Sequence, residues 1–395
     1  MDKSIFDYNE VFKQALKRVT FRLEAASKNQ VELFDKCWYE KYFAMGKYPH
    51  LKGEFNTVLG KSHITIAAST INGRASEPLR MNEGFYELAQ KMFTHAHAFK
   101  LTSDEILEML DMVETIKRNN SQNGIAEAVD YVTEKLFDHT AEAINGVKAR
   151  LDIIILGALS NEGVHSITKE NDPQSPFVGR DMLFGLPDVN RALADAGKVW
   201  YNPSTGVWNA ALQDKTTGLD PVVEIDNMLK PWRSKFKSKK ILVDDATMGF
   251  ILGMEKLKTY LNSTLYPNQP VNINQFNSWL RDHDLPIFEI VRREVNIQNG
   301  DELNVYTPWR TAQLVFLPEA NRIGTIETKF SDRERGLVSE GVTYANYGRI
   351  ETRRMVYGEK EGGEYYELLK AGITAAPAMD TIDRILTLDT TKSSR

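Results

Sequence analysis

The sequence has very little cysteine, no long uncharged apolar run and no excess of basic residues. Its single cysteine, Cys37, cannot form a disulfide within the chain, so the fold must be stable without covalent cross-links, which suits a reducing cytoplasm. The first residues carry charges where a secretory signal needs an apolar core, and no apolar run approaches the roughly 20 residues of a membrane span. We therefore expect synthesis in the cytoplasm and no association with a membrane.

The charge balance and the composition narrow the class of protein further. The formal net charge is −5 at pH 7, which argues against a general affinity for phosphate backbones. The chain has 395 residues, of which 42% are hydrophobic and 26% charged, and this is enough for two or more hydrophobic cores. The sequence therefore predicts a globular protein without a general basic surface for nucleic acid.

The first 101 residues predict a helical arm followed by a long hairpin. Apolar residues three to five positions apart predict helix from residue 4 to about 48, and a group of glycine and proline residues ends it. From residue 54 to about 101 the pattern alternates, and Asn72-Gly73 suits the tight turn of a hairpin. The tip is too polar to form its own core, and long loops without a core are usually functional or bound to a partner. We expect this hairpin to rest on a neighbouring chain.

Two helices are predicted after the hairpin. Thr102 and Glu105 have the spacing of a capping box ahead of an apolar helical face. A longer periodic segment runs from about 124 to 157, and about 33 residues of helix would span roughly 50 Å, so we expect it to form the spine of a domain. Gly146 lies within this segment and should weaken the helix by roughly 1 kcal/mol relative to alanine.

The remainder of the chain predicts short strands and α/β units. Residues 164 to about 220 are rich in turn residues and predict strands and loops. Asp220-Pro221 begins a helix, and Asp244 caps another helix directly after a buried strand at 240–243. Asn299-Gly300 signals a hairpin between flanking strands. The strands predicted in this part are 286–291, 303–306 and 314–318, followed by the antiparallel strands 349–357, 364–369 and 382–388.

Two patterns in the N-terminal half resemble ligand sites. Gly53 to Ser62 looks like a phosphate-binding loop, but six residues separate its glycines where the motif has four, and strand-like alternation follows where a helix is needed. His95 and His97 place two imidazoles on the same side of a strand, yet no cysteine joins them and two ligands fill only half of a zinc site. The favoured interpretation is a hairpin strand for the first and surface or intersubunit histidines for the second.

Two further patterns lie in the C-terminal half. Asp244 and Asp245 follow a strand as magnesium-binding carboxylates do, although an Asp before a helix is more often its N-cap. The run from Lys230 to Lys240 holds six basic residues with Trp232 and Phe236 between them, a combination that can contact nucleic acid. A solvated helix end, or an acidic patch on a neighbour, explains that run equally well. The sequence contains no nucleophile elbow, so we expect no catalytic, cofactor or metal residues.

Mixed-sign clusters occur in the last quarter of the chain, at Arg333, Glu334 and Arg335 and again at Arg353 and Arg354. Clusters of this kind set the register between like subunits, although an exposed ion pair contributes only about 0 to 1 kcal/mol. We therefore predict these arginines as intersubunit contacts.

The order of these parts resembles the HK-97-type capsid fold, and specifically the lambda-like major capsid protein E family of tailed bacteriophages. The resemblance covers nearly the whole chain and depends on the order and spacing of short stretches, none of them specific alone. These stretches are Trp208 followed by Leu219-Asp220-Pro221, then Ile241 to Thr247, then Val305-Tyr306-Thr307-Pro308 leading to Leu314 to Pro318 and Ile323-Gly324-Thr325, and finally Ala375 to Met379.

The resemblance implies an α+β fold with five segments and a function in a shell. The expected segments are an N-terminal arm at 1–53, an E-loop at 54–101 that reaches over an adjacent subunit, a peripheral domain at 102–219 with the spine helix, an α/β axial domain at 220–340, and returning strands of the peripheral domain at 341–395. The expected function is self-assembly into the pentamers and hexamers of an icosahedral head that encloses double-stranded DNA without sequence-specific binding.

The resemblance also implies partners, a location and contact residues. A separate scaffolding protein is expected, because the arm is only about 50 residues long, together with a portal and decoration proteins. The protein would be made in the host bacterial cytoplasm and reside in the virion. An encapsulin-like compartment shell, or an unrecognised α/β enzyme with a site near Asp244 and the Lys230 to Lys240 run, remains as an alternative. The predicted intersubunit contacts are Asn72, Gly73, Arg74, Glu77, Arg80, Arg333, Arg335, Arg353 and Arg354.

Overall fold

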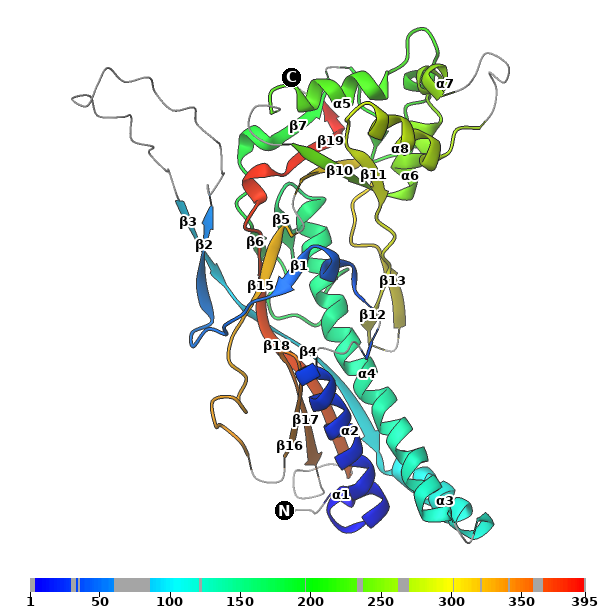
Figure 1. Cartoon of the computed structure of the whole chain (residues 1–395), viewed down its shortest axis with the longest axis vertical. Coiled ribbons are helices and arrows are strands. Elements are labelled where there is room, and N and C mark those ends of the chain that lie inside the picture. Colours follow the sequence, from blue (N-terminus) through cyan, green and yellow to red (C-terminus); the bar gives the residue numbers. More distant parts are fainter. Residues whose placement is uncertain are drawn as a thin grey trace, which may run out of the picture.

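The computed structural model shows an elongated molecule with two parts stacked along its long axis (Figure 1). A six-stranded sheet with the longest helices forms the lower part in this view, and a five-stranded sheet with shorter helices forms the upper part. The structure describes residues 4–29, 33–34, 36–59, 86–120, 123–195, 197–232, 237–261, 270–300, 302–319, 322–339, 342–357 and 365–393.

The lower part is a helix-on-sheet layer. Helix α4 packs on β18 and β4, and α2 packs on α4 and on β16, so both helices cover the same side of the sheet. In order across the sheet the strands are β1 (Phe43–Met45), β15 (Gly324–Thr328), β18 (Tyr366–Ala378), β17 (Ile350–Tyr357) and β16 (Thr343–Tyr347), with β4 (Phe93–Thr102) paired to β18. The helices are α1 (Ile5–Tyr8), α2 (Glu10–Asn29), α3 (Ser103–Asn119) and α4 (Gly124–Leu159).

Helix α4 confirms the predicted spine. It has 36 residues, and its buried face supplies much of the larger hydrophobic core, including Val132, Leu136, Ile144 and Leu151, each at most 1% exposed. Burying a side chain of this size contributes roughly 1.5 to 3 kcal/mol. The predicted capping box before α3 is also present: the Thr102 amide donates to Glu105 Oε2 at 2.7 Å, and the Glu105 amide donates to Thr102 Oγ1 at 3.3 Å.

The glycines inside α4 permit close packing. A Cβ at Gly146 would lie 2.8 Å from His97 Cγ, and a Cβ at Gly157 would lie 2.6 Å from Nδ1 of His165. Real Cβ atoms do not approach other atoms so closely, so each glycine lets a histidine pack directly on the helix backbone. The helix propensity that glycine loses is thus offset by packing that no larger residue allows.

We predict that Gly157→Ala destabilises the protein although alanine favours a helix. Overpacking against the buried His165 should lower the free energy of unfolding by about 1 to 3 kcal/mol. The better helix propensity of alanine should raise it by only roughly 1 kcal/mol, so the net effect should be a loss of stability. Gly249→Ala is the matched control, because Gly249 lies within a helix with no atom within 4 Å of its added Cβ. Urea unfolding of both variants checks this, and equal stabilisation of the two would contradict it.

The upper part confirms the predicted α/β units. Asp220 accepts hydrogen bonds from the amides of Val222 (3.0 Å) and Val223 (3.3 Å), and Asp244 accepts one from the amide of Thr247 (3.2 Å). The helices are α5 (Pro221–Leu229), α6 (Asp245–Leu252), α7 (Glu255–Leu261) and α8 (Ile273–Asp282). The sheet order is β11 (Ile287–Ile290), β10 (Ser238–Val243), β14 (Gln313–Pro318), β19 (Leu386–Ser393) and β7 (Arg191–Ala194).

Four two-stranded sheets and several 3-10 turns complete the described fold. The strand pairs are β2 (Glu54–Leu59) with β3 (Tyr86–Lys91), β5 (Val164–Ser166) with β6 (Asp181–Leu183), β8 (Tyr201–Asn202) with β9 (Val207–Trp208), and β12 (Val295–Asn299) with β13 (Glu302–Tyr306). The 3-10 turns include η1 (Trp38–Lys41), η2 (Asp188–Asn190), η3 (Ala210–Gln213) and η5 (Ile382–Arg384).

The N-terminal helix is shorter than the sequence predicted. Helix α2 ends at Asn29, and the part of the predicted helix that follows contains the turn η1 and the strand β1. The cause is the buried carboxylate of Asp152 on α4, which accepts hydrogen bonds from the amides of Trp38 (3.2 Å) and Tyr39 (2.8 Å). Its Oδ2 also forms an ion pair with Nε of Arg293 at 2.7 Å. A contact with residues far along the chain thus overrides the local helical pattern.

Strand partners also differ from the prediction at two places. The strand before the Asn299-Gly300 turn is β12, whereas β11 pairs in parallel with β10 in the five-stranded sheet. The last strand, β19, pairs with β14 and β7 in the five-stranded sheet and not with the other returning strands. Periodicity predicts a strand but not its partner, because pairing depends on residues distant in sequence. The division of the chain at residues 220 and 340 stays a prediction, although the five-stranded sheet contains strands from both sides of it.

Candidate intersubunit surface

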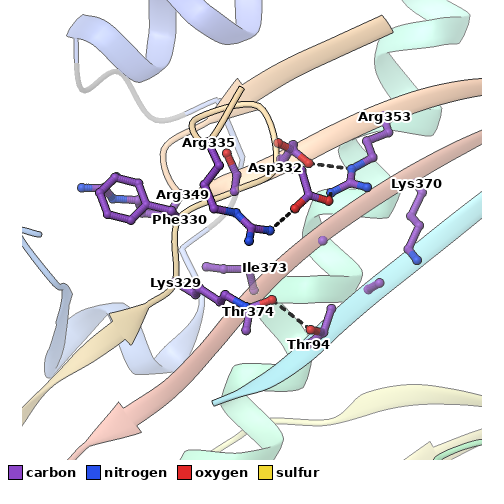
Figure 2. A pocket seen from close by; sticks show the side chains of 14 residues that line it. Thr94, Lys329, Phe330, Asp332, Arg335, Arg349, Arg353, Lys370, Ile373 and Thr374 are labelled. Carbon is purple, nitrogen blue, oxygen red and sulfur yellow. Dashed lines mark hydrogen bonds and ion pairs between the residues drawn. The ribbon is translucent and has the colours of Figure 1, made fainter. Parts of the chain in front are cut away.

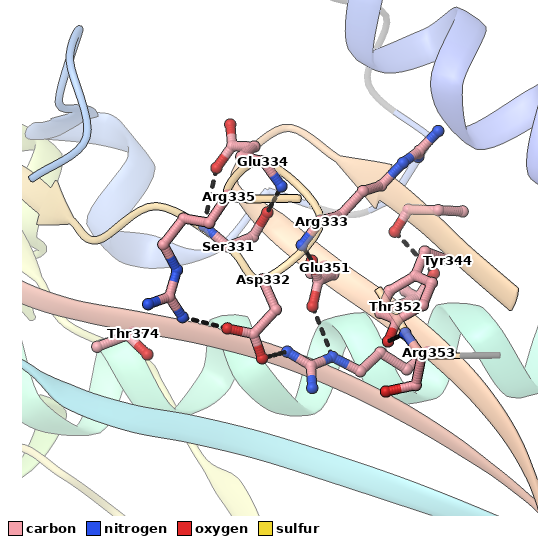
Figure 3. A network of polar contacts seen from close by, with 12 residues as sticks. Ser331, Asp332, Arg333, Glu334, Arg335, Tyr344, Glu351, Thr352, Arg353 and Thr374 are labelled. Atoms are coloured by element: carbon pink, nitrogen blue, oxygen red, sulfur yellow. Dashed lines mark hydrogen bonds and ion pairs between the residues drawn. The ribbon is translucent and has the colours of Figure 1, made fainter. Parts of the chain in front are cut away.

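The predicted cluster at Arg333 and Arg335 lies in the segment between β15 and β16, and Asp332 is its central residue. The Asp332 carboxylate forms ion pairs with Arg335 and with Arg353 of β17, the latter at 2.6 Å (Figure 3). Burial alone would raise the pKa of Asp332, but the hydrogen bonds and charges of the two arginines lower it below its ordinary value. Arg335 of the same segment and Arg353 of β17 therefore share the Asp332 carboxylate. The pair with Arg353 holds the segment against the sheet.

A second carboxylate extends this network. Glu351 of β17, which is 4% exposed, accepts from Nε of Arg353 at 2.6 Å and from the backbone amide of Arg333 at 2.9 Å. The Arg333 guanidinium reaches Glu24 of α2 at 2.6 Å. The sheet, the segment and the N-terminal helix are thus linked by charged side chains on one surface of the lower part.

A concavity of about 310 Å³ opens beside this network (Figure 2). Its floor is the face of β4 and β18 turned away from α4, where Thr94 and Thr374 hydrogen-bond across the strands at 2.9 Å. Basic side chains outnumber acidic ones around it by five to two. The basic residues are Lys329, Arg335, Arg349, Arg353 and Lys370, and the acidic residues are Asp332 and Glu351.

The structure brings Arg333, Arg335 and Arg353 together in one network but not Arg354, and the role of these three arginines as contacts between subunits stays a prediction. Arg354 is 6% exposed, lies 3.7 Å from Glu367, and places its guanidinium over the Phe6 ring. Burial lowers the pKa of this guanidinium, and the charge of Glu367 opposes that shift. Arg354 belongs to the interior of the subunit, and the prediction that it contacts a neighbour is corrected.

The other predicted contacts belong to the tip that the sequence predicts for the hairpin. Asn72, Gly73, Arg74, Glu77 and Arg80 lie outside the described residues. On either side of these residues, β2 and β3 pair antiparallel, and β4 then joins the six-stranded sheet.

Sequence reasoning missed three members of the charged surface. Asp332 and Glu351 neutralise the predicted arginines, and Lys370 lies beside Arg353 on the neighbouring strand. The strand pattern could have indicated Glu351 and Arg353 together, because residues two apart on a strand face the same side. Predicting Lys370 as a neighbour of Arg353 would have required knowing that β17 pairs with β18, and the local sequence does not contain this information.

The competing ligand patterns are occupied by contacts within the chain. Asp245 accepts a bidentate interaction from Arg292, and Asp244 caps α6. In the basic run, Lys237 pairs with Asp284, Lys239 with Glu319 and Lys240 with Glu289, at 2.8, 3.3 and 2.8 Å. The start of the phosphate-loop-like pattern is strand β2, and its last residues, Gly60 to Ser62, lie outside the described part of the chain.

The two histidines of β4 face helix α4. His97 packs at Gly146, while His95 lies beside Arg150 and His165 around a small cavity of about 40 Å³. Burial, reinforced by the charge of Arg150, lowers the pKa of both His95 and His165 to about 4. Across the described residues, no group of three or more His, Cys, Asp or Glu side chains could hold a metal ion.

Only the comparison with solved structures finds proteins similar to this chain. No family model matches the sequence, and no curated protein matches it. Among solved structures, a protein assigned as the capsid protein of a prophage of E. coli CFT073 aligns with a TM-score of 0.53. The alignment covers 94% of this chain and 98% of that one at 12% sequence identity. The chain has the fold of a phage capsid protein.

Two more distant structures also align along most of the chain. The capsid of cyanophage A-1(L) gives a TM-score of 0.44 at 11% identity and covers 87% of this chain and 90% of that one. The virus-like particle of Pyrococcus furiosus gives a TM-score of 0.38 at 7% identity and covers 96% and 99%. These two likenesses are too distant to carry further argument. In the described part of this capsid fold, no helix is long and apolar enough to span a membrane.

We predict that Asp332→Asn loosens the fold locally and lowers the free energy of unfolding by about 1 to 2 kcal/mol at pH 7, because two charged hydrogen bonds are lost. The pKa of Asp332 is lowered in the folded chain. The difference in free energy of unfolding between the variant and the natural chain should therefore persist above about pH 4 and vanish as the pH falls through this lowered pKa. Asp138→Asn, at an exposed carboxylate of α4 outside the network, is the control. Urea unfolding at pH 7 and pH 3 measures the effect, and an equal cost for both variants would contradict it.

Proposed function

We propose that this chain is a structural shell subunit, the major capsid protein of a tailed bacterial virus. In this proposal, copies assemble into pentamers and hexamers of an icosahedral head that encloses double-stranded DNA. The observation that carries the proposal is the fold it shares with a prophage capsid protein across 94% of its own length. The net charge of −5 fits DNA that is enclosed rather than bound along a basic surface.

Several finer assignments belong to the same proposal. Residues 1–53 act as the N-terminal arm, 54–101 as the E-loop, and the two stacked parts as peripheral and axial domains. A separate scaffolding protein, a portal and decoration proteins are the expected partners, and the virion is the expected location. No catalytic step is assigned. Asp244 caps α6, and Lys237, Lys239 and Lys240 of the basic run form ion pairs within the chain.

The proposed mechanism is assembly through repeated contacts. Each contact between two copies can be weak, because symmetry repeats it many times over the shell and several contacts together can exceed a standard interface of about 1,600 Å². The shell would then be stable while a single subunit associates only above a threshold concentration.

Concentration-dependent assembly tests the proposal. The purified chain, alone and with a scaffolding partner, is followed by light scattering and sedimentation velocity across a wide concentration range. We expect a sharp threshold above which very large, uniform particles form. Only monomers at every concentration and with every partner would contradict the proposal. Co-purifying cargo enzymes in place of DNA and tail proteins would favour the encapsulin-like alternative.

A substitution at the hairpin tip gives a second test. Gly73→Val should reduce assembly far more than stability, because the predicted turn at Asn72-Gly73 needs a backbone conformation that valine avoids. The assay compares particle yield with the urea midpoint of the unassembled subunit. Normal yield of particles from this variant would contradict the predicted role of the tip.

A further inference from the structure

Two cations line the concavity beside Asp332 without an ion pair to any described residue. Arg335 and Arg353 are neutralised by Asp332 and Glu351, and Arg349 pairs with Glu334 at 2.9 Å. Among the described residues, no carboxylate pairs with the side chain of Lys329 or of Lys370, and Lys370 is exposed. Within the described part of the chain, the concavity therefore keeps a net positive charge.

The floor of the concavity includes two small residues on paired strands. Ala96 and Gly372 lie opposite one another on β4 and β18, and a Cβ built on Gly372 would be in ordinary contact with Ala96 Cβ at 3.5 Å. Small residues at this pair add little side-chain volume to the floor of the concavity.

The segment that carries Asp332 and Arg335 also exposes apolar side chains. Leu337 and Val338 follow Arg335 in the same segment, and each is 59% exposed. Adjacent apolar side chains held in the open beside an unbalanced charge are typical of surfaces that bind another protein. They do not favour a phosphate backbone, which offers charge but no apolar surface.

Helix α3 presents a matching surface of opposite charge. Asp104, Glu108 and Asp111 recur on its exposed face at the spacing of successive helical turns, and within the described chain no cation pairs with them. Two apolar side chains, Leu107 (58% exposed) and Met112 (45% exposed), lie on the same helix beside these carboxylates. The helix thus combines unbalanced negative charge with exposed apolar surface.

The two surfaces lie on opposite flanks of the molecule. In Figure 1, α3 is at the lower right, and the segment after β15 is to the left of the six-stranded sheet. They cannot meet within one subunit. A contact between different surfaces of two identical chains is heterologous, and when repeated it produces a closed ring or an open filament.

We propose that the acidic face of α3 on one copy docks on the basic concavity of the next copy, with Asp111 and Glu108 facing Lys370 and Lys329 and with Leu107 and Met112 against Leu337 and Val338. This inference rests on the proposed function, since it names the contact that would join neighbouring subunits. Assembly would then depend on ionic strength, because exposed ion pairs are screened by salt.

Charge reversal with rescue tests this contact. Lys329→Glu with Lys370→Glu, and separately Glu108→Lys with Asp111→Lys, should each raise the assembly threshold about tenfold, equivalent to about 1.4 kcal/mol. Combining all four substitutions should restore assembly at least in part, because the charges again match. Lys169→Glu with Lys215→Glu, at exposed lysines outside the concavity, is the matched control and should leave the threshold unchanged.

The outcomes separate this inference from the proposed function. If the natural chain assembles and the concavity variant behaves like the control, the docking contact is wrong while the shell function stands. If both reversals impair assembly without rescue in the combination, the pairing of these two surfaces is wrong. If the natural chain never assembles, the proposed function itself fails.

Cross-linking gives a direct readout. A chain with Lys370→Cys and Asp111→Cys should form disulfide-linked ladders of many subunits on oxidation, since each contact joins two different surfaces. The natural Cys37 is buried and should not take part. Either single substitution can give dimers at most, and a double variant that also stops at dimers would overturn the docking contact.

Discussion

Replacing Asp152 with alanine should lower the free energy of unfolding by about 3 to 5 kcal/mol. Asp152 is fully buried on α4 and accepts from the amides of Trp38 and Tyr39 while pairing with Arg293. Its removal leaves one charge and two amides without their acceptor, and unsatisfied buried groups of this kind carry the largest penalties known for point substitutions. The turn η1 and the connection before β12 should both loosen.

The measurement is urea unfolding followed by tryptophan fluorescence, because Trp38 lies at the site. Adding Arg293→Met to Asp152→Ala should recover part of the loss, since the unpaired charge is then absent. This recovery distinguishes the ion pair from a simple loss of packing. A cost below about 1 kcal/mol for Asp152→Ala would contradict the assignment of Asp152 as the residue that organises this junction.

The stability of the subunit should fall steeply as the pH drops from about 6.5 to 4. The pKa of His95 and of His165 is lowered to about 4, whereas an unfolded histidine titrates near 6.5. Between these values the unfolded chain binds protons that the folded chain does not, so acid favours unfolding. Each histidine can contribute up to about 3 kcal/mol, and both lie between β4, α4 and β5.

Urea unfolding at half-unit pH intervals checks this prediction. His95→Asn should reduce the pH slope by about one proton, while His283→Gln, at an exposed site on the other part of the molecule, should leave it unchanged. A stability that is constant from pH 7 to pH 4.5 would contradict the prediction. In the proposed shell, contacts with neighbouring copies would add stability, so the assembled subunit is expected to tolerate acid better than the free one.

Local signals predicted the parts of the fold whose cause is local. The caps at Thr102, Asp220 and Asp244 and the long helix α4 depend on residues a few positions apart, and all are confirmed. The turn after α2 depends on Asp152, more than a hundred residues away, and periodicity contains no trace of that contact. The same holds for β19, whose partners are β14 and β7.

The charged surface shows where a simple rule was overlooked. Arg353 and Arg354 are adjacent on β17, so they face opposite sides of the sheet and only one can be exposed. Arg353 joins the network of Asp332, while Arg354 faces the interior and Glu367. Strand alternation alone, applied to this pair of charges, is enough to remove Arg354 from the predicted contacts.

Electron cryo-microscopy of the material that forms above the assembly threshold tests the central claim most directly. The account predicts closed icosahedral shells in which this chain occupies five-fold and six-fold positions, with neighbouring copies in head-to-tail contact. Well-ordered preparations that contain only monomers or small closed oligomers, with and without a scaffolding partner, would contradict it.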